Sequence, residues 1–369
     1  MSPIRLRACL LLVCLAVLSA CQSAPRARVQ SARFDVRAGE RAVAERISRA
    51  CEELAPRLVE LVPDTELPEL SVWIQELPTL YEFPLTTLPE ADGFYAPDHR
   101  RIHLRQSAPD LERTLAHEMV HAALGPSWSS LPGTIEEGLC DAVSVELMPQ
   151  SRARLRAGRY CAAAFGMGGL RLSLHIRTDA LVSPDGLTRE LEARVRLEGE
   201  RRESVDPMSV FEAQAGSAST KLSVSRKKAL YGYADLIVDR ILERRGYAGL
   251  HRIATTARQQ GRTQIPRQWL LDAAELTRDP ESWQQALLEG LGPQELEELV
   301  RMQPMLLGDM LVDFLLPLPQ GADLDALLAG TSMTICAQPE AASINLLAIP
   351  EFRHSVRARL ARLQDKADS

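Results

Sequence analysis

The residues between positions 117 and 141 have types and spacings that suit a metal site. His117 and His121 flank Glu118 in Leu-Ala-His-Glu-Met-Val-His, an apolar stretch that favours a helix. Histidines four residues apart leave one helical face, so both imidazoles can bind one metal ion at about 2.0–2.1 Å. Glu118 then stands beside the open position of the metal. Because this pattern arises by chance in roughly one such chain in a hundred, it needs support from other residues.

A second helix-forming segment supplies that support. Residues 134–143 contain Glu136, Glu137 and Asp141, and they follow a connection at 125–133 that is rich in glycine, proline and serine. Such a connection lets two helices fold back on each other. Glu137 and Asp141 share a helical face, so Glu137 could bind the metal while Asp141 accepts the outer N–H of a ligand imidazole.

These two segments resemble the gluzincin (thermolysin-like, peptidase-MA-like) zinc metallopeptidases, in which H-E-x-x-H is followed by E-x-x-x-D. The resemblance implies one Zn²⁺ per chain, bound by His117, His121 and Glu137, with Glu136 as the less favoured third ligand. It also implies that Glu118 is the catalytic general base. The gap between the two motifs is shorter than in thermolysin, which leaves the geometry of the connection open.

Cys140 stands where this family usually has a small residue such as alanine. We interpret it as a packed small side chain and not as a ligand, because free cysteine behaves as a small hydrophobe. It is one of four cysteines that remain after the export predicted below, and no spacing among them selects a disulfide pairing: Cys51, Cys140, Cys161 and Cys336.

A third point of resemblance lies at residues 230–246, an aliphatic helix that ends at Gly246. In the family a helix of this kind starts with a tyrosine that faces the site. Tyr231 is the matching position and Tyr233 is the alternative. Tyr231 would aim its hydroxyl at the developing oxyanion, or it would pack beneath the site with a hydrogen-bonded hydroxyl. The resemblance covers roughly residues 72–302.

The elements that position the site precede it in the chain. Residues 40–61 have apolar side chains at helical spacing, residues 70–74 read as a strand, and residues 93–104 read as a hairpin. The resemblance implies that the strand Arg101–Leu104 is the exposed edge of a sheet. An extended peptide substrate would add to that edge through main-chain pairing.

The N-terminus reads as an export signal. Arg5 and Arg7 precede the apolar run Ala8–Leu18, which is too short to span a bilayer of about 30 Å comfortably. It ends in Leu-Ser-Ala-Cys, which resembles the bacterial lipobox and implies lipidation of Cys21. Gln22 then implies a place on the outer membrane, facing the periplasm, if the host has two membranes. The alternative is an ordinary signal peptide with an incidental cysteine.

The predicted fold class is α+β. A small N-terminal mixed sheet, with an edge strand packed on the H-E-x-x-H helix, is followed by a mainly helical C-terminal lobe. The predicted segments are a signal peptide at 1–20, the lipidated cysteine and tether at 21–34, a zinc-binding lobe at 35–150, a helical lobe at 151–302 that completes the peptidase domain, and a helical extension at 303–369.

The predicted function is that of a membrane-anchored zinc metallopeptidase acting on peptides or proteins. An endopeptidase is slightly favoured, because the exopeptidase signature Gly-Ala-Met-Glu-Asn is not found. The alternative is a catalytically silent lipoprotein of the same fold that acts as a binding or scaffold module, but the intact Glu118 argues against it. The net charge of −6, with both signs interspersed, makes nucleic acid an unexpected partner.

Overall fold

The computed structural model describes residues 25–75, 92–182, 188–197, 204–212, 223–302, 304–318, 321–337 and 343–367. Over these residues the fold is mixed α+β, with 11 α-helices and two sheets, which confirms the predicted class at this level. The chain divides into two compact units. The first comprises 1–152, 211–222 and 237–275, and the second comprises 153–210, 223–236 and 276–369. Cys21 and the signal peptide at 1–20 lie outside the described residues.

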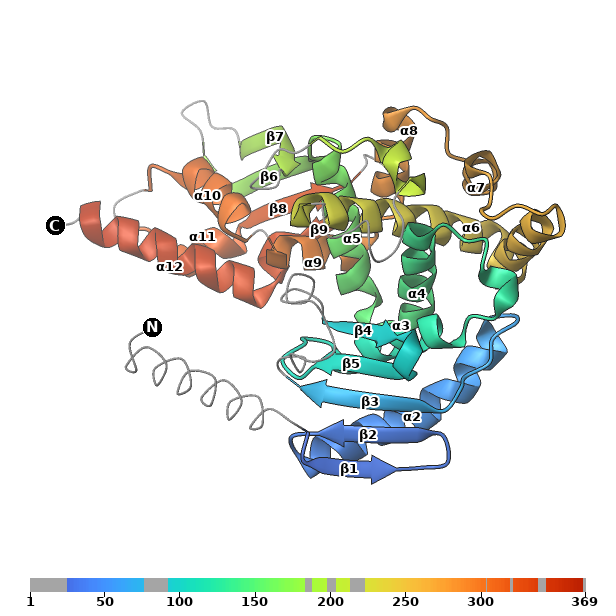
Figure 1. Ribbon diagram of the computed structural model, residues 1–369. Helices are drawn as coiled ribbons and strands as arrows, with labels where there is room; N and C mark the ends of the chain where they lie inside the picture. The colour runs from blue at the N-terminus through green and yellow to red at the C-terminus, as the bar shows by residue number, and fades with distance from the viewer. Residues whose placement is uncertain are drawn as a thin grey trace, which may run out of the picture. The chain divides into compact units, whose positions relative to one another are not determined.

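The first unit is built on a five-stranded sheet in the order β1-β2-β3-β5-β4 (Figure 1). Strands β2, β3 and β5 run parallel, and the edge strands β1 and β4 each pair antiparallel with their neighbour. The bounds are β1 Ala27–Gln30, β2 Phe34–Ala38, β3 Leu70–Gln75, β4 Gly93–Ala96 and β5 Arg101–Arg105. The predicted strand at 70–74 is thereby confirmed.

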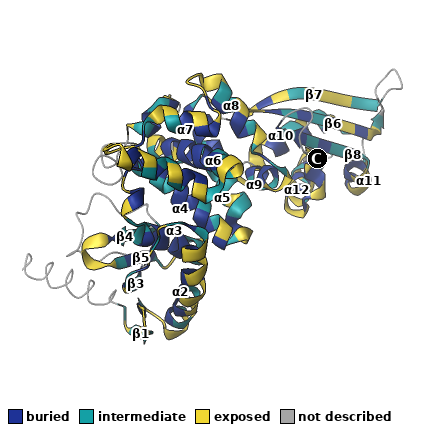
Figure 2. Ribbon diagram, turned by 90° about the vertical axis from the view of Figure 1, so that its right-hand side faces the viewer, coloured by how far each residue is buried: buried dark blue, intermediate teal, exposed yellow. Residues whose placement is uncertain are grey.

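One face of this sheet is apolar and is covered by helices α2 (Arg41–Leu61) and α3 (Leu111–Ala123) (Figure 1). Alternate residues on the strands, such as Val36, Val72 and Ile102, are fully buried, as the two-residue period of a half-buried strand requires. The predicted helix at 40–61 is confirmed as α2. Its sheet-facing side is buried and its outer side is exposed (Figure 2).

The predicted hairpin at 93–104 is confirmed, but the predicted edge strand is wrong. β4 and β5 are joined by the short 3₁₀ helix Pro97–His99. β5 pairs with β3 on one side and β4 on the other, so β4 forms the edge and Arg101–Leu104 does not. β5 lies inside because it pairs in parallel with β3. Its burial matches this position, since Ile102 and Leu104 are fully buried, whereas in β4 only Ala96 is buried.

The second unit contains a sheet that the sequence did not predict. Four antiparallel strands are arranged in the order β7-β6-β8-β9, where the helical prediction for 151–369 placed no strand: β6 Leu170–Val182, β7 Thr188–Leu197, β8 Thr331–Cys336 and β9 Ser343–Asn345. Alternate residues of β6 and β8 are buried on one face. The two-residue period is present in β6, where Leu170, Leu172, Leu174 and Ile176 alternate with polar residues, but the helical prediction passed over it. Only the pairing of β8 with β6 joins strands about 150 residues apart along the chain.

Helices make up the rest of the second unit. Those after α9 lie within the helical extension predicted at 303–369. The bounds are α5 Arg152–Gly166, α8 Pro280–Glu289, α9 Pro293–Met302, α10 Pro304–Leu315, α11 Leu324–Ala329 and α12 Pro350–Ala367. Helices α11 and α12 pack on each other, and α11 also contacts β6 and β8. Within the described residues, no helix is both long and apolar enough to cross a membrane.

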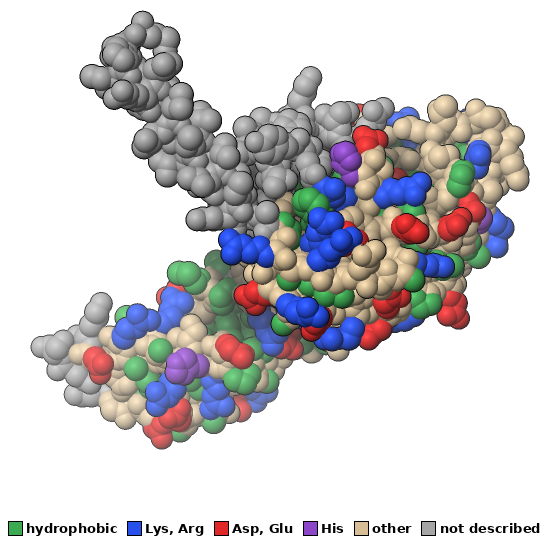
Figure 3. Space-filling view, turned by 60° about the horizontal axis from the view of Figure 1, so that its bottom comes forward, with side chains coloured by type: hydrophobic (Ala, Val, Ile, Leu, Met, Phe, Trp, Pro, Cys, Tyr) green, Lys and Arg blue, Asp and Glu red, His purple; other side chains and the backbone are tan. Residues whose placement is uncertain are grey.

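The long helix α6 (Val224–Gln259) is two helices joined at Gly246, where φ is 62° and ψ is 179°. Glycine adopts this backbone conformation without steric cost, and the predicted helix end at residue 246 coincides with the break. Helix α7 (Arg267–Ala274) follows in the first unit. On the face of the molecule shown in Figure 3, acidic and basic side chains are interspersed.

Candidate metal centre

Helix α3 carries the H-E-x-x-H motif, and its sequence explains its start and its orientation. The Asp110 side chain caps the helix by accepting a hydrogen bond from the Arg113 backbone N–H at 3.3 Å, and Glu112 adds negative charge to the first turn. Leu115 and Met119 are fully buried. Packing of these residues leaves His117 and His121 on one face of the helix, with ring centroids 5.1 Å apart.

The connection after α3 turns the chain so that α4 (Gly133–Leu147) returns along α3 (Figure 1). It is pinned by Asp64, whose carboxylate accepts hydrogen bonds from the Ser127 N–H at 3.1 Å and from the Ser127 hydroxyl. The indole of Trp128 also donates to the Pro63 carbonyl at 2.7 Å. The α3–α4 return that the Gly/Pro-rich segment predicted is therefore confirmed.

Three potential ligand atoms converge where α3 and α4 face each other. Oε2 of Glu137 lies 3.2 Å from Nε2 of His117 and 3.6 Å from Nε2 of His121. Ligands at about 2.0–2.1 Å from a tetrahedral zinc ion stand roughly 3.3–3.4 Å from one another. Both distances lie near this value, so the Glu137 carboxylate is placed where it could share one ion with each histidine. Their role as zinc ligands stays a prediction.

The outer nitrogen of each histidine meets a carboxylate. Nδ1 of His117 lies 2.9 Å from Oδ1 of Asp141, as the predicted role of Asp141 requires. Nδ1 of His121 lies 2.7 Å from Oε1 of Glu136. Such partners fix the tautomer, so that Nε2 of each ring is directed at the metal position. Glu136, which sequence reasoning kept only as a substitute ligand, thus occupies the supporting position beside His121.

Sequence reasoning missed Arg113. Its Nη1 lies 3.6 Å from Oδ1 of Asp141, and its side chain is 13% exposed. The buried guanidinium balances the charge of a carboxylate that is itself fully buried. A signal existed, because Arg113 precedes His117 by one helical turn and so shares the face that meets α4.

Cys140 also lies at the centre. One ligand atom from each of His117, His121 and Cys140 falls within 4.8 Å of the others, so geometry permits a thiolate as an alternative ligand. Burial raises the pKa of the Cys140 thiol to about 12, which keeps it neutral at physiological pH. A bound metal ion would displace the thiol proton, so Cys140 and Glu137 are both candidates for the third ligand. The structure places Cys140 in a fully buried position, which accords with its interpretation as a packed side chain.

The charges of the centre are strongly coupled. Burial lowers the pKa of His117, but its hydrogen bonds to Asp141 and Glu137 outweigh burial and raise the pKa to about 9. Burial acts to raise the pKa of Glu137, yet His121 and His117 hold it well below its usual value. Burial raises the pKa of Glu118, which suits a base that must accept and return a proton near neutral pH.

Tyr231 and Tyr233 belong to the second unit, where the Tyr-Gly-Tyr sequence has a packing role. A Cβ atom on Gly232 would lie 2.1 Å from the Arg159 carbonyl oxygen, so only glycine permits the close approach of α6 to α5. The buried Tyr233 donates its hydroxyl to the Val205 carbonyl at 3.0 Å. The Arg159 guanidinium lies over the Tyr231 ring at 5.2 Å. A catalytic role for Tyr231 stays a prediction.

Comparison with known proteins found no match to this chain among protein-family models, curated proteins or solved structures.

Proposed function

We propose that this protein is a zinc-dependent metallopeptidase of the gluzincin type. The observation that carries the proposal is the convergence of His117 Nε2, His121 Nε2 and Glu137 Oε2 at separations of 3.2 and 3.6 Å, which suit one tetrahedral ion. Glu118, 6% exposed, stands on the same helix between the two histidines. A purely structural zinc site has no use for this carboxylate, so its presence favours catalysis over a silent scaffold.

Zinc, when bound at such a site, supplies a Lewis acid that lowers the pKa of a water molecule toward about 7. Glu118 removes the proton of the attacking water and delivers it to the amine that leaves the scissile peptide bond. Its raised pKa makes it a weak enough acid to hold that proton between the two steps. Asp141 and Glu136 hold the imidazoles of His117 and His121 in the required tautomers.

The substrate strand would pair with β4, which takes the place of the edge predicted at Arg101–Leu104. The outer side of β4 faces no other described strand, and β4 packs directly on α3. A Cβ atom on Gly93 would lie 2.7 Å from Cγ2 of Thr114, one turn before His117. Main-chain pairing along β4 would place an extended peptide beside the metal-binding helix with little demand on its sequence.

This mode of binding fits an endopeptidase, because an edge strand accepts the middle of a chain as readily as its end. The lipobox at Cys21 supports export and anchoring on the periplasmic side of a membrane, where peptides and unfolded proteins would be the substrates.

The test is zinc content together with peptide cleavage by the purified full chain. We expect about one zinc per chain, loss of the zinc in Glu137→Ala, and cleavage of a mixed peptide library that Glu118→Gln reduces by at least about a thousandfold while zinc is retained. Glu146→Gln is the matched control, since this exposed carboxylate lies on α4 outside the centre and should change neither property.

Two results would contradict the proposal. If the reconstituted protein holds no zinc, the metal centre is wrong. If it holds zinc but cleaves no peptide at any pH between about 5 and 9, a binding or scaffold role replaces the peptidase.

A further inference from the structure

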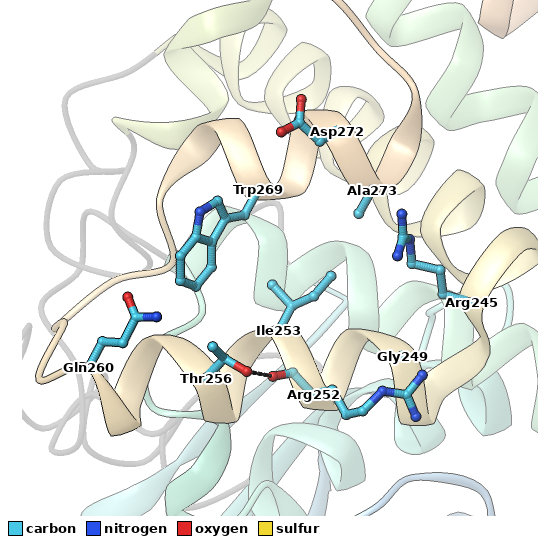
Figure 4. A pocket seen from close by; sticks show the side chains of 9 residues that line it. All are labelled: Arg245, Gly249, Arg252, Ile253, Thr256, Gln260, Trp269, Asp272 and Ala273. Carbon is cyan, nitrogen blue, oxygen red and sulfur yellow. Dashed lines mark hydrogen bonds between the residues drawn. The ribbon is translucent and has the colours of Figure 1, made fainter.

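A cleft of about 420 Å³ lies on the first unit, lined by the second part of α6 and by α7 (Figure 4). None of the residues that line it belongs to the metal centre. Its volume falls in the range of about 300–1,000 Å³ that is usual for ligand sites. It has room for one or two large side chains of a partner.

The floor and one wall of the cleft are apolar. Gly249 and Ala273 are buried, while Ile253 and Trp269 are partly exposed and point into the cleft from opposite helices (Figure 4). The Arg262 guanidinium lies 5.5 Å from the centre of the Trp269 ring, so the indole has cationic as well as apolar surroundings. Gly249 and Ala273 are small and so leave room for a ligand between the helices. The Trp269 indole and the Ile253 side chain form an apolar surface that an aliphatic or aromatic group can contact.

Two arginines on the α6 side carry unbalanced charge. Among the described residues, the guanidinium groups of Arg245 and Arg252 form no ion pair and no hydrogen bond, although both line the cleft. Their neighbours differ: Arg244 pairs with Glu275 at 3.1 Å, and Arg240 donates to the Ala274 carbonyl at 3.0 Å. A side chain on Gly249 would collide with Cβ of Arg245 at 2.4 Å, so glycine keeps the space beside Arg245 open.

The opposite wall does not neutralise this charge. Asp272 accepts a hydrogen bond from Gln268 at 2.7 Å, and in Figure 4 its carboxylate points away from the cleft. The Thr256 hydroxyl donates a hydrogen bond to the Arg252 carbonyl oxygen at 2.7 Å. Gln260 also lines the cleft from α6, and its Oε1 accepts a hydrogen bond from Arg262 at 3.2 Å. The charged groups along α6 are therefore the guanidinium groups of Arg245 and Arg252, and such donors suit carboxylates.

We propose that this cleft binds a short acidic peptide segment of a partner protein. A bulky apolar side chain of the segment sits against Trp269 and Ile253, and flanking aspartate or glutamate carboxylates pair with Arg245 and Arg252. Charge complementarity selects this occupant. A bilayer surface fits less well, because Trp269 lies within a concave wall and does not project outward.

The proposal is independent of the proposed peptidase activity, and the experiment keeps the two apart. The probe is the fluorescein-labelled peptide Asp-Glu-Leu-Phe-Asp-Glu, blocked at its C-terminus, and its anisotropy is measured with the full chain in EDTA so that no metal-dependent cleavage occurs. Saturable binding is expected, weakened about tenfold by Arg252→Glu and about tenfold by Trp269→Ala. Raising the salt from about 0.05 to 0.5 M should also weaken it.

Arg267→Glu is the matched control, because this exposed arginine lies on α7 outside the cleft, and it should bind the probe as the unmodified protein does. Thermal unfolding verifies that each variant is folded, and the exposed Arg252 keeps the test valid if Trp269→Ala does not fold.

Four results would overturn the proposal. They are no saturable binding up to about 1 mM peptide, equal binding of a probe with lysines in place of the acidic residues, equal loss of binding in Arg267→Glu, and full competition by inorganic phosphate, which would define a simple anion site. Binding to phosphatidylglycerol vesicles that Arg252→Glu abolishes, without peptide binding, would assign the cleft to a membrane surface instead.

Discussion

Nδ1 of His117 lies 2.9 Å from Oδ1 of Asp141, and the same carboxylate oxygen lies 3.6 Å from Nη1 of Arg113. The three groups alternate in charge: the Arg113 guanidinium contacts the Asp141 carboxylate, which contacts the His117 imidazole at the proposed metal site. Asp141 is fully buried, so water neither screens its charge nor competes for its carboxylate. Because Nδ1 of His117 faces Asp141, Nε2 is the nitrogen that would bind the proposed metal ion.

Asp141→Asn should therefore weaken zinc binding by about 10- to 100-fold, because the neutral amide holds the imidazole less firmly and makes it less basic. The zinc content at saturating metal should stay near one per chain. Competition with a chelating dye measures the affinity. Glu136→Gln tests the equivalent contact to the more exposed His121 and should have a smaller effect. An Asp141→Asn protein with unchanged zinc affinity would show that the His117–Asp141 contact does not support the metal.

The third ligand can be assigned by a pair of variants. Glu137→Ala should lose the zinc, because it removes the charged oxygen between the two Nε2 atoms. Cys140→Ala should keep it and should lower the free energy of unfolding by about 1 kcal/mol, the usual scale for removing a small buried group. Metal analysis after dialysis measures both. Loss of zinc in Cys140→Ala with retention in Glu137→Ala would assign the thiolate as ligand.

Zinc affinity should rise with pH. In the metal-free protein the pKa of His117 is raised to about 9, so below that pH the ring carries a proton that the metal must displace. Burial acts to lower the pKa of His121, but the neighbouring Cys140 and Glu137 outweigh burial and raise this pKa as well. Metal binding therefore displaces more than one proton, and the apparent affinity should increase at least about tenfold per pH unit between roughly pH 6.5 and 9. Calorimetric titration in buffers of different ionisation enthalpy measures the protons released. An affinity that is constant across this range would contradict the charge state inferred for the centre.

The same pKa has a consequence for stability. Because the pKa of His117 is raised above its unfolded value of about 6.5, its contribution is complete below that pH and is lost as the pH rises through about 9. Metal-free protein should therefore unfold at lower urea concentration at pH 9.5 than at pH 6, and saturating zinc should reverse this trend. An equal midpoint at both pH values without metal would contradict the prediction.

Local patterns in the sequence predicted the two helices and the turn that carry the candidate centre. The spacing of His117 and His121, the break after α3 and the i, i+4 relation of Glu137 and Asp141 are properties of single helices and one turn, and each is present in the structure. These features follow from the period of the helix and from glycine and proline chemistry. The contact between Arg113 and Asp141 depends instead on how two helices pack, which no single-helix pattern contains.

Strand order was harder to predict for the same reason. The turn near Pro97 identified a hairpin, but the choice between β4 and β5 as the edge depends on which strand pairs with β3, more than 20 residues earlier. The second sheet joins β6 to β8 across an even longer separation. The α6–α7 cleft is a further case, since it depends on the packing of side chains from two helices.

The connection between α3 and α4 offers a test of how the loop supports the centre. The Ser127 hydroxyl donates to the Asp64 carboxylate and lies 2.8 Å from Nε2 of His251, on α6. Ser127→Ala removes both contacts and should lower the free energy of unfolding by about 1 kcal/mol at pH 7. Ser129→Ala is the matched control, because this exposed serine lies on the same connection and should change little.

The pH dependence separates this contact from simple loss of packing. Hydrogen bonds from Ser127 are the main cause of the lowered pKa of Asp64. A carboxyl group with a lowered pKa stabilises the fold above its unfolded pKa of about 3.8 and loses that effect as the pH falls through its folded pKa. The difference in urea midpoint between Ser127→Ala and the unmodified protein should therefore shrink as the pH falls below about 4. A difference that is equal at pH 7 and at about pH 3 would mean that the Asp64 carboxylate does not pin the connection.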